Sequence, residues 1–173
     1  MKKTIYTLLL CLPALLCSCS SHNEDLLGRW SSQTPARVVA EEPQSVQQGF
    51  IFNPDGTFAR SITLTDRGVP LAVAMVSGEW EYFRGAKLRD GFTALVGITY
   101  DLGTLRVEAM NPNFQTHRIQ QWRTSLASRF SLHNDRQNGA AHNQPVYALR
   151  ITRLNASHLL IDSSEGSVRL RRL

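Results

Sequence analysis

The chain has 173 residues, of which 42% are hydrophobic and 19% are charged, a composition typical of a globular protein. Its formal net charge of +5 falls to about +3 if Lys2 and Lys3 are removed with an N-terminal signal. This excess is too small to favour nucleic acid, so we expect no nucleic-acid partner.

The N-terminal segment has the pattern of a cleaved export signal. Lys2 and Lys3 precede an apolar stretch from Ile5 to Leu16, and Cys19 follows shortly after it. The stretch holds about a dozen apolar residues, fewer than the roughly 20 that a membrane-spanning helix needs. Pro13 also lies inside it, where it would break a helix. We therefore predict a signal peptide over residues 1–18.

Cys19 is the predicted site of lipid attachment. The small residue Ser18 precedes it and Leu16 lies three positions upstream, whereas Cys17 would have the bulky Leu16 directly before it. The segment resembles the lipobox of bacterial lipoproteins. This resemblance implies a diacylglycerol thioether on Cys19 and an amine acylated by a fatty acid such as palmitate. Two or three acyl chains hold a protein firmly on a membrane, so the membrane is the expected partner through Cys19.

Cleavage of the signal peptide and lipidation of Cys19 would leave no free thiol. Cys11 and Cys17 would leave with the signal peptide and Cys19 would carry lipid, so we expect neither a disulfide nor a cysteine nucleophile. The roughly 155 residues that remain can form one hydrophobic core. The predicted organisation is a signal peptide over 1–18, a lipidated polar tether over 19–25 and one domain over 26–173.

From Leu26 onward, apolar and polar residues alternate between turn signals, which predicts half-buried antiparallel strands. The first sets that share a face are Phe58, Arg60, Ile62 and Leu64; Leu71, Val73 and Met75; and Phe92, Ala94, Val96, Ile98 and Tyr100. We expect hairpins or reversals at 53–56, 101–103, 155–157 and 163–166. Because open strand edges are costly, about eight strands predict an all-β, antiparallel up-and-down barrel.

One segment departs from this alternation. Between Gln115 and Asp135 there is no glycine or proline, and Ile119, Trp122, Leu126 and Phe130 recur at helical spacing. We therefore predict an amphipathic helix inserted before the last strands.

Two interpretations of this helix stay open. It lies across the barrel with solvated arginines, or it forms a basic lid or membrane-facing element. Its candidate interaction residues are Arg118, Trp122, Arg123 and Phe130.

Several motifs together carry a resemblance that covers nearly the whole predicted domain. They are Leu27-Gly28-Arg29-Trp30, the segment 52–58, the segment 78–82 and an arginine-rich last strand. These motifs resemble the lipocalin-like lipoproteins of Bacteroidetes. The resemblance implies a calycin barrel with a cup, anchored at the outer membrane, on a periplasmic or surface face that the sequence does not decide.

The resemblance also implies a structural motif at the barrel base. Gly28 and Trp30 match the Gly-x-Trp pattern whose tryptophan closes the base beneath an arginine of the last strand. Alternation directs Val168 and Leu170 inward, so Arg172 is the in-phase candidate for that arginine.

The candidate lining of the cup combines aromatic and apolar side chains with one arginine. Its residues are Phe58, Arg60, Ile62, Met75, Trp80, Tyr82, Phe92 and Tyr100. The same residues equally suit a packed core, because a barrel of eight strands can be filled by its own side chains. Arg60 either points outward or is buried with a partner, which would be Glu79, Glu81, Glu108 or the acid group of a ligand.

The sequence contains no motif that favours an enzyme. His-Glu-x-x-His, Gly-x-Ser-x-Gly and glycine-rich phosphate loops are absent, and the histidines are scattered. We therefore expect no catalytic residue, no metal and no cofactor.

Two functions remain. The first is a lipid-anchored envelope protein that binds a small apolar or amphipathic ligand in an open cup. The second is a non-enzymatic accessory module of an envelope complex. It would have a filled barrel and use the 115–145 segment, with exposed Trp122 and Phe130, as its contact surface.

Overall fold

The computed structural model describes residues 25–32, 36–37, 44–83, 91–139, 149–163 and 166–173. The elements in chain order are β1 (Gly28–Ser32), β2 (Ala36–Arg37), β3 (Gln44–Phe52), β4 (Thr57–Asp66), β5 (Val69–Tyr82), β6 (Thr93–Ala109), α1 (Thr116–Gly139), β7 (Leu149–Asn155), β8 (His158–Ser163) and β9 (Gly166–Arg172). The predicted signal peptide, Cys19 and the tether up to residue 24 lie outside the described residues.

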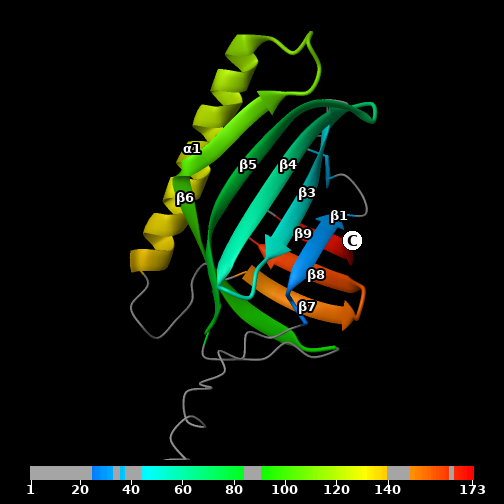
Figure 1. The fold of residues 1–173 in the computed structure, drawn as a ribbon, viewed down its shortest axis with the longest axis vertical. Coiled ribbons are helices and arrows are strands. Elements are labelled where there is room, and N and C mark those ends of the chain that lie inside the picture. Colours follow the sequence, from blue (N-terminus) through cyan, green and yellow to red (C-terminus); the bar gives the residue numbers. More distant parts are fainter. Residues whose placement is uncertain (1–24, 33–35, 38–43, 84–90, 140–148, 164–165) are drawn as a thin grey trace, which may run out of the picture.

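Eight of these strands form a closed antiparallel barrel (Figure 1). Neighbouring strands in the sheet follow the order β1-β9-β8-β7-β6-β5-β4-β3, and β1 pairs with β3 as well as with β9, which closes the ring. β2 pairs with the first part of β3, ahead of the residues that β1 covers. The predicted up-and-down barrel, with one helix before the last strands, is confirmed.

The strand register defines which side chains face inward. Trp30, Phe50, Arg60 and Val76 are cross-strand partners in one row, and all four are buried. In the adjacent row, Ser31, Gly49, Ser61 and Met75 are also partners, and Met75 is 40% exposed. Because successive side chains of a strand point to opposite faces, the first row lines the interior and the second lies on the outer surface.

Met75 and Phe92 were predicted to line the cup, but both side chains are exposed. In β5 the buried set is Ala72, Ala74 and Val76, so Met75 points outward. Ala74 and Val76 join the barrel core, and Ala72 joins the cluster against which Ile119 and Trp122 of α1 pack. Phe92 is 64% exposed because β6 begins at Thr93, so Phe92 precedes the regular alternation.

The reversal predicted at Asp101-Leu102-Gly103 is also wrong. β6 runs continuously through these residues, and its register against β5 shifts between Met75 and Ser77. The Asp101 carboxylate accepts a hydrogen bond of 2.9 Å from the Gly103 N–H. The residues therefore form a bulge, which uses the same turn chemistry as a hairpin. The predicted turns at 53–56 and 155–157 do connect strands, β3 to β4 and β7 to β8.

The predicted helix is present as α1, which runs beside β6 (Figure 1). Within the described part of the chain, β7 pairs with Thr93–Val96, and the rest of β6 extends past these pairs. α1 packs against this extension, and its Leu126 and Phe130 join the barrel core. Near its N-terminal end, Ile119 and Trp122 pack on a second cluster that includes Leu64, Ala72 and Phe114.

Trp30 and Arg172 meet where β1 pairs with β9. The Trp30 ring is buried and its Nε1 donates a 2.8 Å hydrogen bond to the Leu26 carbonyl. The Arg172 guanidinium lies 5.0 Å from the ring centroid and donates to the Leu27 carbonyl. Arg172 is thus the arginine over Trp30, and Gly28 lies beside its side chain with a positive φ of 117°.

Replacing Gly78 with alanine tests the register of β5 against β6. A Cβ there would overlap the Thr99 carbonyl oxygen on β6 and lie 2.8 Å from Cε1 of Phe58. Since backbone must move to relieve the overlap, we expect Gly78→Ala to lose about 3 kcal/mol or more in urea unfolding. The adjacent Ser77→Ala is the control. Equal stability of the two variants would contradict the pairing of β5 with β6.

Candidate functional site

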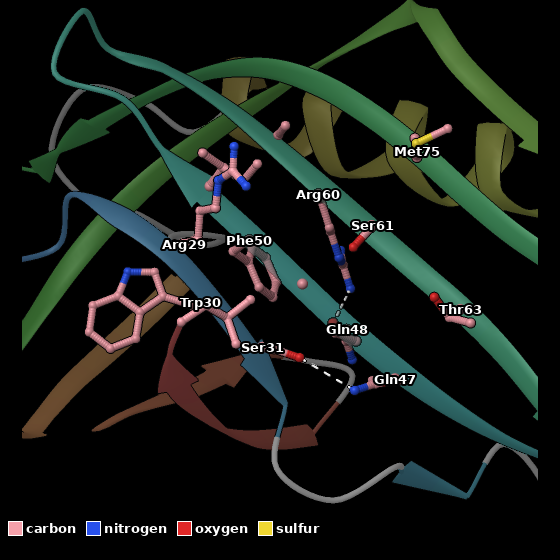
Figure 2. A pocket seen from close by; sticks show the side chains of 14 residues that line it. Arg29, Trp30, Ser31, Gln47, Gln48, Phe50, Arg60, Ser61, Thr63 and Met75 are labelled. Carbon is pink, nitrogen blue, oxygen red and sulfur yellow. Dashed lines mark hydrogen bonds between the residues drawn. The ribbon is translucent and has the colours of Figure 1, made fainter. Parts of the chain in front are cut away.

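Arg60 is the charged residue of the described barrel interior. Its side chain is 9% exposed, and it projects from β4 into the core. Nη1 donates a 2.7 Å hydrogen bond to the Tyr100 hydroxyl, and Nη2 donates a 2.8 Å bond to Oε1 of Gln48. Figure 2 shows the second bond joining adjacent strands. Of the two alternatives left open by the sequence, Arg60 therefore adopts the inward one, in which a buried arginine requires hydrogen-bond partners.

Two aromatic rings flank the same guanidinium. Its carbon lies 5.3 Å from the Phe50 ring centroid and 5.7 Å from that of Phe130. A cation over an aromatic face gains about 0.5 to 2 kcal/mol, with the larger value in a desolvated site. We call Arg60, Gln48, Tyr100 and Phe50 the Arg60 cluster.

The acidic partners considered from the sequence lie elsewhere. Glu79, Glu81 and Glu108 are all exposed. The hydrogen bonds of Arg60 described above go instead to a neutral amide and a neutral phenol. The Arg60 cluster thus combines fixed hydrogen-bond donors with apolar ring surface, the combination that orients an amphipathic molecule in a pocket.

An aromatic wall continues from the Arg60 cluster. Tyr100 meets the edge of Phe58 at 5.4 Å between centroids, and Trp80 meets Phe52 and Tyr82 at 5.5 and 5.4 Å. Of the predicted lining residues, the structure brings Phe58, Arg60, Ile62, Trp80 and Tyr100 into the buried interior. Tyr82 is half-buried against the same core.

α1 covers the Arg60 cluster with a ring of its own. The Phe130 ring stacks on Tyr100, with 4.2 Å between centroids and 21° between planes. Phe130 is only 3% exposed. The prediction that Trp122 and Phe130 form an exposed patch is therefore wrong. Phe130 is inside the barrel, and Trp122 is half-buried on the side of α1 that packs on the core. Arg118 and Arg123 are exposed, as expected for a helix laid on the barrel with solvated arginines.

Side chains of α1 also bond to the backbone of β6. The Asn134 amide accepts from the Tyr100 N–H at 2.9 Å and donates to the Tyr100 carbonyl at 2.8 Å. His133 Nε2 lies 3.0 Å from the Ile98 carbonyl oxygen. A neighbouring strand would make the same kind of paired bond, so the Asn134 side chain bonds to Tyr100 as a strand does, beyond the described pairs of β6 with β7. We call this pair of bonds the Asn134 clamp.

A groove of about 430 Å³ lies over strands β1, β3, β4 and β5 (Figure 2). The outward row Ser31, Gly49, Ser61 and Met75 contributes to its lining. A Cβ at Gly49 would lie 2.5 Å from Oγ of Ser61, so glycine keeps this part of the surface hollow. Because the row consists mostly of small residues, the sequence offered no positive signal for the groove.

Sequence reasoning also missed Gln48 and Asn134. Gln48 shares the inward phase of Phe50, so alternation could have placed it in the interior once β3 was recognised. Asn134 carries no such signal, because its role depends on where the helix lies relative to β6.

Within the described ranges, no group of three or more histidine, cysteine or acidic side chains is placed to hold a metal ion. The described helix is not apolar enough to cross a bilayer. No protein-family model and no curated protein matches the chain.

Removing the Asn134 clamp should loosen α1. Asn134→Ala deletes two hydrogen bonds to a partly buried backbone, each worth about 0.5 to 1.5 kcal/mol. We expect a loss of about 1 to 3 kcal/mol in urea unfolding. The neighbouring Asp135→Ala, at an exposed position, should be neutral. A neutral Asn134→Ala would show that α1 does not depend on this contact.

Proposed function

We propose that the protein is a lipid-anchored component of the cell envelope with a lipocalin-like barrel, and that it binds a small amphipathic molecule inside that barrel beneath α1. The Arg60 cluster is the observation that carries this proposal. It sets hydrogen-bond donors at one point of an interior that is otherwise lined by aromatic and apolar side chains.

Stability alone is a poor reason for an arginine at this position. Removing a charge from water carries a large penalty, and replacing buried ionic groups with apolar side chains of similar size is often neutral or stabilising. An amphipathic guest gives the arginine a use, because its apolar body would lie on the aromatic wall while its polar end accepts hydrogen bonds from the guanidinium.

The binding claim can be tested with the guest that the protein carries from its own envelope. The full chain, purified in mild detergent, should show by native mass spectrometry an added mass that disappears on denaturation. Arg60→Met keeps an elongated apolar side chain but removes the donors, so its occupancy should fall at least about tenfold. Arg29→Met, at an exposed position on β1, should keep the guest. A native mass spectrum of the chain without substitutions that shows no bound guest would contradict the proposal.

Anchoring through Cys19 rests on the lipobox pattern. Cells fed an alkyne analogue of palmitate should label the native chain and Cys17→Ser, whereas Cys19→Ser should remain unlabelled. Cys17→Ser is the matched control because it removes the neighbouring thiol and leaves Ser18 and Cys19 unchanged. Label on Cys19→Ser would place the lipid elsewhere.

An accessory role in an envelope complex is the second candidate. It is favoured by the packing of Leu126 and Phe130 inside the barrel, which makes α1 part of the core. The exposed side of the 115–145 segment, including Arg118 and Arg123, would then meet the partner. Residues 140–145 of that segment lie outside the described residues. This role predicts a bare mass, together with a partner retained by cross-linking in cells.

A further inference from the structure

We propose that the Phe130 side chain occupies the position that the ring of the guest takes, and that the guest is a planar aromatic acid. This inference rests on the proposed function and specifies the chemical class of its ligand. In the structure, the Phe130 ring of α1 fills this position.

The surroundings of Phe130 fit a flat π system. One face of its ring stacks on Tyr100 at 4.2 Å, and the Arg60 guanidinium carbon lies 5.7 Å from its centroid. Tyr100 is itself held by the edge of Phe58 at 69° and by the His133 ring at 74°. We call the space between Tyr100 and Arg60 the Phe130 slot. Offset stacking and cation–π attraction both act on an aromatic ring and are lost for a saturated one.

Arg60 selects the polar end of the guest. A guanidinium carries only donors, so the polar end that it binds must offer acceptor oxygens, as a carboxylate does. Its burial strengthens this interaction, because the barrel interior screens charge far less than water does. The Tyr100 hydroxyl, which accepts a bond from Arg60, also has a proton that it can donate to such an acid.

α1 packs on the barrel along its length, because Trp122 packs against both clusters and Leu126 joins the barrel core. Ile119 and Trp122 pack near its N-terminal end with Leu64, Ala72 and Phe114. Phe130, His133 and Asn134 bind near its C-terminal end. Opening of the Phe130 slot therefore requires the C-terminal part of α1 to leave the barrel, with loss of the stacking on Tyr100 and of the Asn134 clamp.

The test measures binding of 1-naphthoate by titration calorimetry to the full, lipidated chain in nanodiscs. Decahydronaphthalene-1-carboxylate keeps the acid without the π system, and 1-naphthalenemethanol keeps the rings without the acid. We expect naphthoate to bind at least about tenfold more tightly than either analogue.

Phe130→Leu should bind naphthoate about tenfold more tightly than the native chain, because an aliphatic side chain competes less well for the Phe130 slot. Leucine keeps the buried position apolar and nearly filled, so this variant should remain folded, whereas Phe130→Ala would leave a cavity and risk unfolding. Leu132→Ala, at an exposed position on the same helix, is the control and should bind like the native chain.

Each outcome separates the inference from the proposed function. Unchanged affinity in Phe130→Leu would overturn the inference, and so would equal binding of the saturated acid or of the alcohol. Absence of naphthoate binding, with a native guest still seen by mass spectrometry, would overturn the aromatic-acid class and leave the proposed function standing. Absence of both naphthoate binding and a native guest would overturn both.

Discussion

The length of β6 relative to β7 is the constraint on which the structure depends. β6 spans Thr93–Ala109, and among the described residues β7 pairs with it from Thr93 to Val96. Backbone groups on a strand edge need partners, and the Asn134 clamp supplies them at Tyr100. Because α1 must lie against this edge, its apolar side enters the barrel and brings Phe130 onto Tyr100 and Arg60.

The same contacts therefore serve the core and the candidate site. Phe130 contributes to stability by covering the Arg60 cluster, and a guest that enters must offset the loss of those contacts. Arg60 links the two roles, since its hydrogen bonds join β3, β4 and β6 across the interior. In the proposed function, this coupling would let a barrel with a continuous core also hold a small molecule.

Alternation predicted the barrel, and helical spacing predicted the helix. An arginine over Trp30 was implied by the family resemblance, and alternation selected Arg172 for it. Alternation defines which residues share a face but not which face is inward, so the larger Leu71, Val73 and Met75 were favoured over Ala72, Ala74 and Val76. Which face of β5 is inward depends on tertiary packing, because Ala74 and Val76 join the core and Ala72 joins the second cluster, and this packing has no local signal. Likewise, 101–103 carries turn chemistry that suits either a hairpin or the observed bulge.

The central claim is that the C-terminal part of α1 is a cover that opens independently of the barrel. Native-state hydrogen exchange on the full chain, without added ligand, tests this directly. The amides of residues 126–135 should exchange through an opening of lower free energy than the amides of residues 159–161 in β8. Exchange of both segments only through one common unfolding event would contradict the claim, since the barrel interior would then be closed to any guest.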